Sequence, residues 1–416
     1  MHCALCINKL GVLNKMFISC SCREEIWEIP RAGVACVAGY WNPEEFAPSS
    51  KPTLIEWQDG ILTSIKDNDA ILMNDRVHNW ANFYIMPGWL DVHVHLALDS
   101  LDFNKSLTNW SKPTQMHENL EKILRRYLEL GIVGIRDGGD LTGYGWLAKK
   151  KINDGEWVGP KVQSVREAVY RIGSYGRFLG TGFKDIEDWR ANRDDFFALG
   201  LDQLKVIVSG LISFRKLGVV GPVQWTLADL QQVVNDAHEK GIRVMAHVSG
   251  EEAITLAIHA GVDSLEHGYY ITYNHLSMML EKGIAWIPTV APVGNLLARA
   301  TRRYTLEEKG VLRSILRRHL DSIYEAYQLK VSLGVGTDAG AYHVPHAESL
   351  LDEMMWFAQS GIPTLEVRRM ASLENAKIMG WPNFGRLQLG TAMDTLQLSD
   401  HLFGTFACSL ANKVNS

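Results

Sequence analysis

The chain has 416 residues, of which 46% are hydrophobic and 21% are charged, a composition typical of globular proteins. The formal net charge of −5 argues against a nucleic-acid-binding protein, which usually carries a basic surface. No segment offers the roughly 18 consecutive apolar residues that a membrane helix requires, and the N-terminus lacks the uninterrupted apolar core of a signal peptide. We therefore expect a cytoplasmic protein that binds neither a membrane nor nucleic acid.

The first 86 residues are predicted to contain an extension and most of a small β domain. Residues 1–30 match no recognisable pattern, and we expect an extension that need not be ordered. Within 31–86, two apolar segments flank Asp59-Gly60, and this dipeptide is a strong signal for a tight turn between antiparallel strands. Residues 385–416 hold short apolar pieces, which we expect to return to this domain and complete a β-sandwich.

Residues 87–384 alternate between predicted strands and helices. Strands are expected at 90–96, 131–137, 161–168, 203–209, 243–248, 264–268, 285–290 and 332–338. Helices are expected at 115–130, 227–240, 251–260, 276–282 and 306–329, and glycines such as Gly261 and Gly283 follow them, as C-terminal helix stops do. Eight strands alternating with helices predict a (β/α)8 barrel. An open doubly wound sheet is the alternative, but the Gly-rich dinucleotide fingerprint that would favour it does not follow the first strand.

Two histidines lie two positions apart at the end of the first predicted barrel strand. The segment Met-Pro-Gly-Trp-Leu-Asp-Val-His-Val-His places them at His93 and His95. Because residues i and i+2 of a strand point to the same face, both imidazoles would face one cavity, as two ligands of one metal ion must. A chance pair on a polar face is the alternative, so the interpretation depends on further ligands downstream.

Such ligands are expected at the C-terminal ends of the other strands, where (β/α)8 barrels carry their chemistry. Four polar side chains lie in or directly after predicted strands: Lys205, His247, His267 and Asp338. A single strand-end histidine is more often structural, and a single aspartate is usually a helix cap. Lys205 is harder to explain in this way, because a lysine inside an apolar strand is almost never fully buried without a partner.

The segments that carry these residues resemble the amidohydrolase superfamily over roughly residues 50–395. The resemblance rests on the His93–His95 strand, on the stretch 131–139, on Glu266-His-Gly, on the stretch 336–340 and on the stretch 371–380. Within the superfamily, the sequence is most similar to the imidazolonepropionase-like and prolidase-like dipeptidase branch. The resemblance implies a metal-dependent hydrolase that cleaves a carbon–nitrogen bond in an amide, a cyclic amide or a dipeptide.

The resemblance also implies roles for six residues. His93, His95 and Asp338 would hold one divalent ion, and His247 and His267 would hold a second. Lys205 would react with CO2 to form a carbamate that bridges the ions, which removes the problem of a buried ammonium group. Zinc fits this mixture of imidazole and carboxylate ligands best. A hydroxide that bridges the ions would attack the carbonyl, and Asp338 would be the catalytic proton carrier.

The substrate is expected to be a small molecule gripped by the loop at residues 166–182. This loop is rich in Gly, Tyr and Arg, and arginine suits bidentate recognition of a carboxylate. We predict substrate contacts from Tyr170, Arg171 and Arg177, and from His343 shortly after Asp338. Solvated arginines on a surface loop are the alternative. A homo-oligomer is also compatible with the sequence.

Two other functions remain open at this point. A mononuclear deaminase of the same superfamily would use a glutamate as proton shuttle, and Glu251 and Glu252 follow His247 closely. Lys205 argues against that function, because such sites lack a bridging lysine. A catalytically inactive scaffold with the same fold is the other alternative. Inactive relatives typically lose metal ligands, whereas all six positions are filled here.

Overall fold

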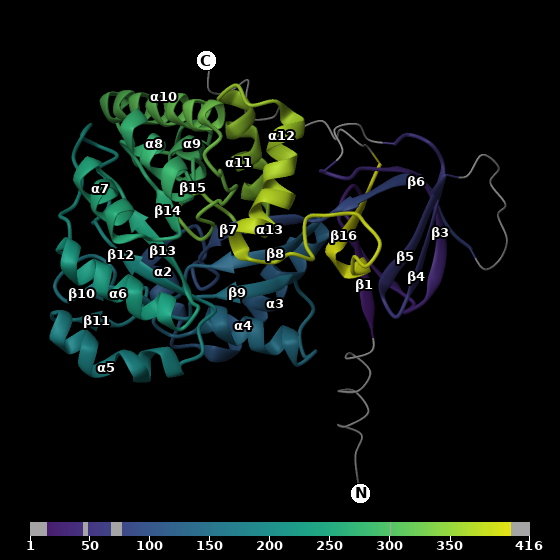
Figure 1. Cartoon of the computed structure of the whole chain (residues 1–416), viewed down its shortest axis with the longest axis horizontal. Coiled ribbons are helices and arrows are strands. Elements are labelled where there is room, and N and C mark those ends of the chain that lie inside the picture. The colour runs from purple at the N-terminus through teal and green to yellow at the C-terminus, as the bar shows by residue number, and fades with distance from the viewer. Residues whose placement is uncertain (1–14, 45–48, 68–76, 300, 401–416) are drawn as a thin grey trace, which may run out of the picture.

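The computed structural model describes residues 15–44, 49–67, 77–299 and 301–400, and it is an α/β structure. Figure 1 shows a β-rich part on the right, beside a larger part in which helices surround parallel strands. No helix in these four ranges is both long enough and apolar enough to cross a membrane.

The β-rich part is a single seven-stranded mixed sheet with the order β2-β1-β16-β6-β3-β4-β5. Its strands are β1 (Met16–Cys20), β2 (Glu25–Ile29), β3 (Gly33–Tyr40), β4 (Thr53–Gln58), β5 (Ile61–Asp67), β6 (Val77–Pro87) and β16 (Leu396–Ser399). Strand β4 buries alternate residues, with Ile55 and Trp57 inside, as expected for a strand with one face on a core. The predicted β-sandwich is not confirmed, because the described strands form one sheet.

The predicted turn at Asp59-Gly60 is confirmed. Strands β4 and β5 are antiparallel, with Gln58 opposite Ile61, and both turn residues have positive φ angles of 53° and 80°. Two positive φ angles define the type I′ geometry whose twist matches a hairpin.

Residues 16–29 differ from the prediction of an N-terminal extension. They form β1 and β2, and β1 pairs in parallel with β16, with Ser19 opposite Gln397. The partner of β1 lies almost 380 positions away along the chain, so local patterns could not reveal the pairing. Residues 1–14 and 401–416 lie outside the described residues. The division of the chain into domains therefore stays a prediction, with a sheet that begins earlier than residue 31.

The larger part contains two parallel sheets. The first has the order β7 (Trp89–Val94), β8 (Ile132–Asp137) and β9 (Lys161–Ser164). The second has the order β11 (Gly182–Phe183), β10 (Ala168–Arg171), β12 (Gln203–Ile207), β13 (Arg243–Val248), β14 (Ser264–His267) and β15 (Ala285–Ile287). Strands β7, β8 and β12 are buried at every position, as expected for parallel strands covered on both faces. Fully burying a Val or Leu side chain contributes about 1.5–3 kcal/mol to stability.

Helices connect and cover these strands, and all five predicted helices are present. The α-helices are α2 (Phe103–Asn109), α3 (Pro113–Glu129), α4 (Tyr144–Asn153), α5 (Ile186–Ala198), α6 (Leu227–Glu239), α7 (Glu251–Ala260), α8 (Tyr273–Lys282), α9 (Ala291–Ala298), α10 (Leu306–Leu329), α11 (Glu348–Gln359), α12 (Thr364–Arg369) and α13 (Asn375–Met379). Gly261 and Gly283 end α7 and α8 with φ angles of 83° and 69°, the left-handed conformation that favours glycine at this position.

Two segments connect the two parallel sheets. The predicted third strand is broken at Arg166, whose φ angle is 60°, so that β9 pairs with β8 while β10 pairs with β12. The predicted eighth strand appears only as isolated parallel bridges, from Leu333 to Trp286 of β15 and from Ala339 to Val94 of β7. No closed barrel is detected among the described residues, although both segments lie where a barrel would close.

Candidate metal centre

The structure brings together the six side chains predicted to be metal ligands. His93 and His95 lie at the end of β7, while Lys205, His247 and His267 come from β12, β13 and β14. These three strands are adjacent and parallel, with Ile207 opposite His247 and Val248 opposite His267. Parallel strands in this register bring their C-terminal ends to one edge, and Asp338 lies at the same edge, directly before the bridge from Ala339 to Val94.

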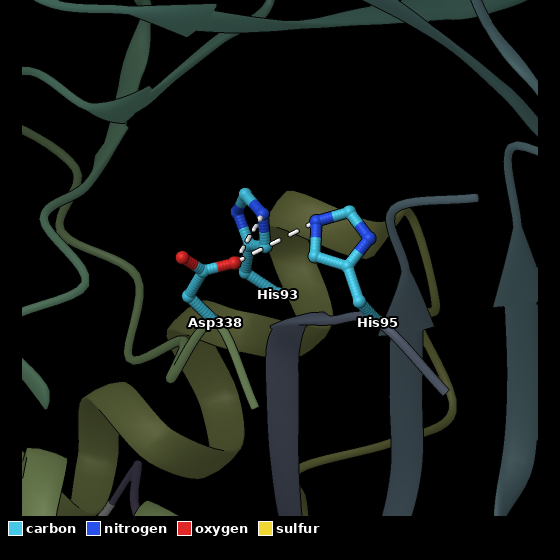
Figure 2. A group of neighbouring side chains, drawn as sticks. All are labelled: His93, His95 and Asp338. Carbon is cyan, nitrogen blue, oxygen red and sulfur yellow. Dashed lines mark ion pairs between the residues drawn. The ribbon is translucent and has the colours of Figure 1, made fainter. Parts of the chain in front are cut away.

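His93, His95 and Asp338 form a compact group that could hold a metal ion. Their ligand atoms lie within 4.8 Å of one another, and the Oδ1 atom of Asp338 is 3.6 Å from the Nε2 atoms of both histidines (Figure 2). The backbone N–H of Asp338 donates to the carbonyl of His93 at 2.7 Å, which fixes the carboxylate beside the pair. Asp338 has a φ angle of 58°, a left-handed conformation that clusters at functional sites.

Three of the imidazoles are oriented through their Nδ1 atoms. His93 donates to Glu266 Oε2 at 2.6 Å, and His95 donates to the carbonyl of Gly139 at 3.2 Å. His267 Nδ1 is 2.7 Å from Thr289 Oγ1. These contacts leave each Nε2 atom available as a ligand, which is how metal-binding histidines are usually held.

His247 offers an unused ligand atom. Its Nε2 is buried and has no hydrogen-bond partner within the described part of the chain, and its ring lies 4.6 Å from the His267 ring. Burial, together with the charge of Lys205, lowers the pKa of His247 to about 3. Burying a polar nitrogen without a hydrogen-bond partner normally lowers the stability of the fold. A metal ion that binds the lone pair of this nitrogen would compensate for that loss.

Lys205 lies at the centre of the group with no exposed surface. Its Nζ atom is 3.2 Å from His93 Nε2 and 3.1 Å from His95 Nε2. Burial lowers the pKa of Lys205 to about 8, although the carboxylates of Asp338 and Glu266 oppose this effect. Roughly a tenth of this lysine is therefore uncharged at pH 7, far more than for an ordinary lysine, and an uncharged amine is the form that can react with CO2.

A glycine beside Lys205 keeps space for additional atoms. A Cβ atom at Gly138 would lie 2.7 Å from Lys205 Nζ and 2.6 Å from His95 Cε1. A side chain larger than glycine would therefore fill the space next to the amine. The donor set, the unpartnered nitrogen of His247 and this space all fit a site that holds metal ions and a modified lysine.

Asp338 is poised to exchange a proton. Burial raises its pKa to about 7, and the charge of Lys205 opposes this shift while Glu266 adds to it. The side chain retains 19% of its exposed surface, so it also contacts the cavity. A carboxyl group with a pKa near the working pH is suited to general acid–base catalysis.

Three buried charged residues around the site, Arg136, Glu266 and Asp91, were not predicted from the sequence as functional residues. Arg136 Nη2 donates to both oxygens of Glu266, at 2.9 and 3.0 Å, and Glu266 in turn holds His93. Asp91 was missed as well, and it accepts hydrogen bonds from the N–H and hydroxyl of Thr337 at 3.0 and 2.7 Å. The available signal was the occurrence of charged residues of opposite sign inside strands that are otherwise apolar.

A cavity of about 790 Å³ opens onto the candidate metal ligands. Its floor includes His95, Lys205, His247, His267 and Asp338. Its walls are mostly apolar or aromatic and include Leu98, Leu101, Phe103, Tyr175, Phe178, Leu211, Ile212, Phe214, Tyr269, Leu296, Tyr304 and Tyr342. A mostly apolar cavity with a few convergent polar groups is typical of a small-molecule site.

None of the four predicted substrate-binding residues lines this cavity. Tyr170 is buried in β10. The Nη1 atom of Arg171 lies 3.9 Å from Asp229 Oδ2, and its guanidinium lies over the ring of Trp225. Arg177 is exposed, and the cavity reaches Tyr342 but not the neighbouring His343. The predicted loop does contribute to the wall, but through Tyr175, Phe178 and Leu179. Sequence pattern located the loop and could not determine which of its side chains turn inward.

Residues 84–406 match the sequence model of the amidohydrolase family. The chain belongs to the amidohydrolase family. The resemblance seen in the sequence is therefore confirmed, and membership supports a hydrolase that acts on carbon–nitrogen bonds.

Among proteins of known sequence, this amidohydrolase is 27% identical to an ochratoxinase of Aspergillus niger over 345 residues, which cover 76% of this chain and 70% of that protein. It is 31% identical to an uncharacterised protein of Mycobacterium tuberculosis over 170 residues, covering 40% and 45% of the two chains.

Solved structures of amidohydrolases share its fold. A Xaa-Pro dipeptidase with bound methionine superimposes with a TM-score of 0.75 at 21% identity, covering 87% of this chain and 92% of the other. The A. niger ochratoxinase superimposes with a TM-score of 0.72 at 22% identity, covering 86% and 88%. These neighbours have a TIM-barrel fold, which agrees with the parallel strands described above.

Proposed function

We propose that this protein is a binuclear, metal-dependent amidohydrolase that cleaves an amide carbon–nitrogen bond in a small molecule. The observation that carries the proposal is the position of Lys205, a fully buried lysine between two histidines at the floor of a cavity. The names of the relatives, an ochratoxinase and a Xaa-Pro dipeptidase, support a peptide or peptide-like amide as substrate.

In this proposal, His93, His95 and Asp338 hold one divalent ion, and His247 and His267 hold the other. A carbamate on Lys205 contributes a ligand to both. Zinc is the ion that best suits imidazole and carboxylate ligands, although other divalent metals bind similar sets. The neutral state of the histidines supports this assignment, since burial lowers the pKa of His93, His95 and His267 well below the usual value.

The ions would polarise the scissile carbonyl and lower the pKa of a bound water toward neutrality. Asp338 then accepts the proton of the attacking water on its carboxylate and delivers it to the leaving nitrogen. The walls of the cavity exclude bulk water from the amide, which strengthens the electrostatic interactions of the floor residues.

We also propose that residues 87–384 form a closed (β/α)8 barrel, with 161–171 and 333–339 as the segments that join the two parallel sheets. The seven-stranded sheet then forms the small β domain. The cytoplasmic location and the homo-oligomer remain predictions.

Replacement of the bridging lysine tests the function directly. A Lys205→Ala variant should lose about 99% or more of the amidase activity on a panel of dipeptides, N-acyl amino acids and cyclic amides, because it removes the shared ligand. Lys205→Glu should regain part of that activity, since its carboxylate can partly replace the carbamate. Lys122→Ala, which removes an exposed lysine on α3, is the matched control. Full activity of Lys205→Ala would contradict the binuclear mechanism.

A further inference from the structure

We infer that Arg303 binds a carboxylate group of the substrate, so that the enzyme selects amides that carry a free carboxylate together with a bulky apolar group. This inference rests on the proposed function, because it concerns the substrate of the same site. It assigns a specificity-determining residue that lies on neither the predicted loop nor any strand end.

The cavity is lined by five charged side chains besides its histidines, and four of them are already engaged. Lys205 and Asp338 belong to the metal centre. The carboxylate of Asp102 accepts the N–H of Lys105 at the start of α2. The guanidinium of Arg215 pairs with Glu308 and also donates to the carbonyl of Arg303 at 3.1 Å.

Arg303 is the remaining charge, and its guanidinium contacts aromatic rings instead of an acid. Its Cζ atom lies 4.9 Å from the centre of the Tyr342 ring and 6.0 Å from that of Tyr304, and both tyrosines line the cavity. Within the described ranges of the chain, this side chain forms no ion pair. Stacking on aromatic faces orients a guanidinium while leaving its N–H donors free for a planar, bidentate partner such as a carboxylate.

The backbone that carries Arg303 is also held in place. The hydrogen bond from Arg215 fixes the carbonyl of Arg303, and Arg215 is itself anchored by Glu308 at the N-terminus of α10. Tyr342 lies four positions after Asp338, which links this wall of the cavity to the metal centre. The backbone that carries the exposed Arg303 side chain is therefore fixed beside the cavity, which reduces the entropy lost when the guanidinium binds an anion.

Another wall of the cavity suits a bulky apolar group. The rings of Phe103 and Phe178 meet edge to face, with centres 4.8 Å apart, and Tyr175 lies 5.8 Å from Phe178 and 5.3 Å from the His247 ring. This aromatic surface extends to the metal centre. The charged group beside it, Asp102, is an acid that would repel a carboxylate, so the carboxylate and the apolar group are expected to occupy different walls.

The test compares N-benzoyl-L-phenylalanine with its methyl ester, which has the same amide but no carboxylate charge. Benzoate release is measured for the wild type, for Arg303→Gln and for the control Arg302→Gln, which alters the adjacent exposed arginine outside the cavity lining. Arg303→Gln should raise KM for the acid about tenfold, as loss of one charged hydrogen-bonding pair predicts, with little change in kcat. KM for the ester should stay within about twofold, and Arg302→Gln should resemble the wild type.

Calorimetric titration of the metal-loaded protein with N-benzoyl-L-phenylalanine provides a readout that does not need turnover. The inference expects Arg303→Gln to weaken binding of the acid about tenfold. Equal effects on acid and ester, or unchanged binding of the acid, would overturn the role of Arg303. Either result would leave the proposed function intact as long as Lys205→Ala still abolishes amidase activity.

Discussion

Among the residues that the structure describes, a lysine without exposed surface, an imidazole nitrogen without a hydrogen-bond partner and a carboxyl group with a pKa of about 7 lie together. Each of these side chains would destabilise an ordinary core, because burial without compensation costs free energy. Their convergence on one cavity indicates that the cost is offset by ligands. Lys205 could be singled out from the sequence for the same reason, since it interrupts an apolar strand.

At the residue scale, Glu266 is predicted to strengthen metal binding without being a ligand. Glu266→Gln removes the charge that Arg136 and His93 share, and outer contacts of this kind typically change metal affinity about 10–100-fold. Competition with a chelator should therefore show metal affinity reduced at least about tenfold relative to wild type.

The control for this variant is Glu252→Gln, which changes an exposed glutamate at the start of α7. It should keep the wild-type affinity. If Glu266→Gln itself bound metal with the wild-type affinity, Glu266 would serve only to neutralise Arg136.

At the scale of elements, the ends of the strands explain why the sequence could indicate which candidate ligands lie together, whereas it could not indicate which loop side chains line the cavity. Strand polarity and the two-residue repeat fix where His93, His95 and His247 point. The loop at 166–182 has no such repeat, and its direction depends on a contact made elsewhere in the chain, the edge-to-face packing of Phe178 on Phe103. Arg303 was missed because Tyr342 and the other distant residues that line the cavity come near it only after folding.

Helix α9 provides a prediction about pH. Glu353 has no exposed surface and accepts the N–H groups of Val290 and Ala291 at 2.8 and 2.7 Å, at the N-terminus of this helix. Burial raises its pKa from 4.5 to about 8, so the native protein holds this proton more tightly than the unfolded chain. The stability that the group contributes is therefore present below pH 4.5 and is lost as the pH rises through about 8.

Glu353→Gln cannot titrate, and it resembles the protonated acid. Denaturation of both proteins from below pH 4.5 to above pH 8 should show the free energy of unfolding of the wild type falling relative to the variant. Glu118→Gln, which changes an exposed glutamate on α3, should show no such trend. If the free energy of unfolding of the wild type rose relative to the variant with increasing pH, the two backbone donors would lower the pKa of Glu353 more than burial raises it.

At the scale of the whole molecule, the alternation of strands and helices was predictable, and the expected return of residues 385–416 to the β-rich part agrees with the pairing of β16 with β6. The hairpin at Asp59-Gly60 and the strand carrying His93 were located correctly, because their signals are local. The pairing of β1 with β16 joins segments near opposite ends of the chain, and it was missed. Because long-range pairings leave no local signal in the sequence, the sequence also could not show that the described strands form a single sheet where a sandwich was expected.

The metal content of the whole protein is the most direct test of the proposed binuclear centre. Protein produced with isotopically labelled bicarbonate should contain two divalent ions per chain and a carbonyl resonance from a carbamate. Lys205→Ala should lack that resonance and hold fewer ions. A wild-type protein that binds a single ion, with Lys205 unmodified, would contradict the binuclear centre.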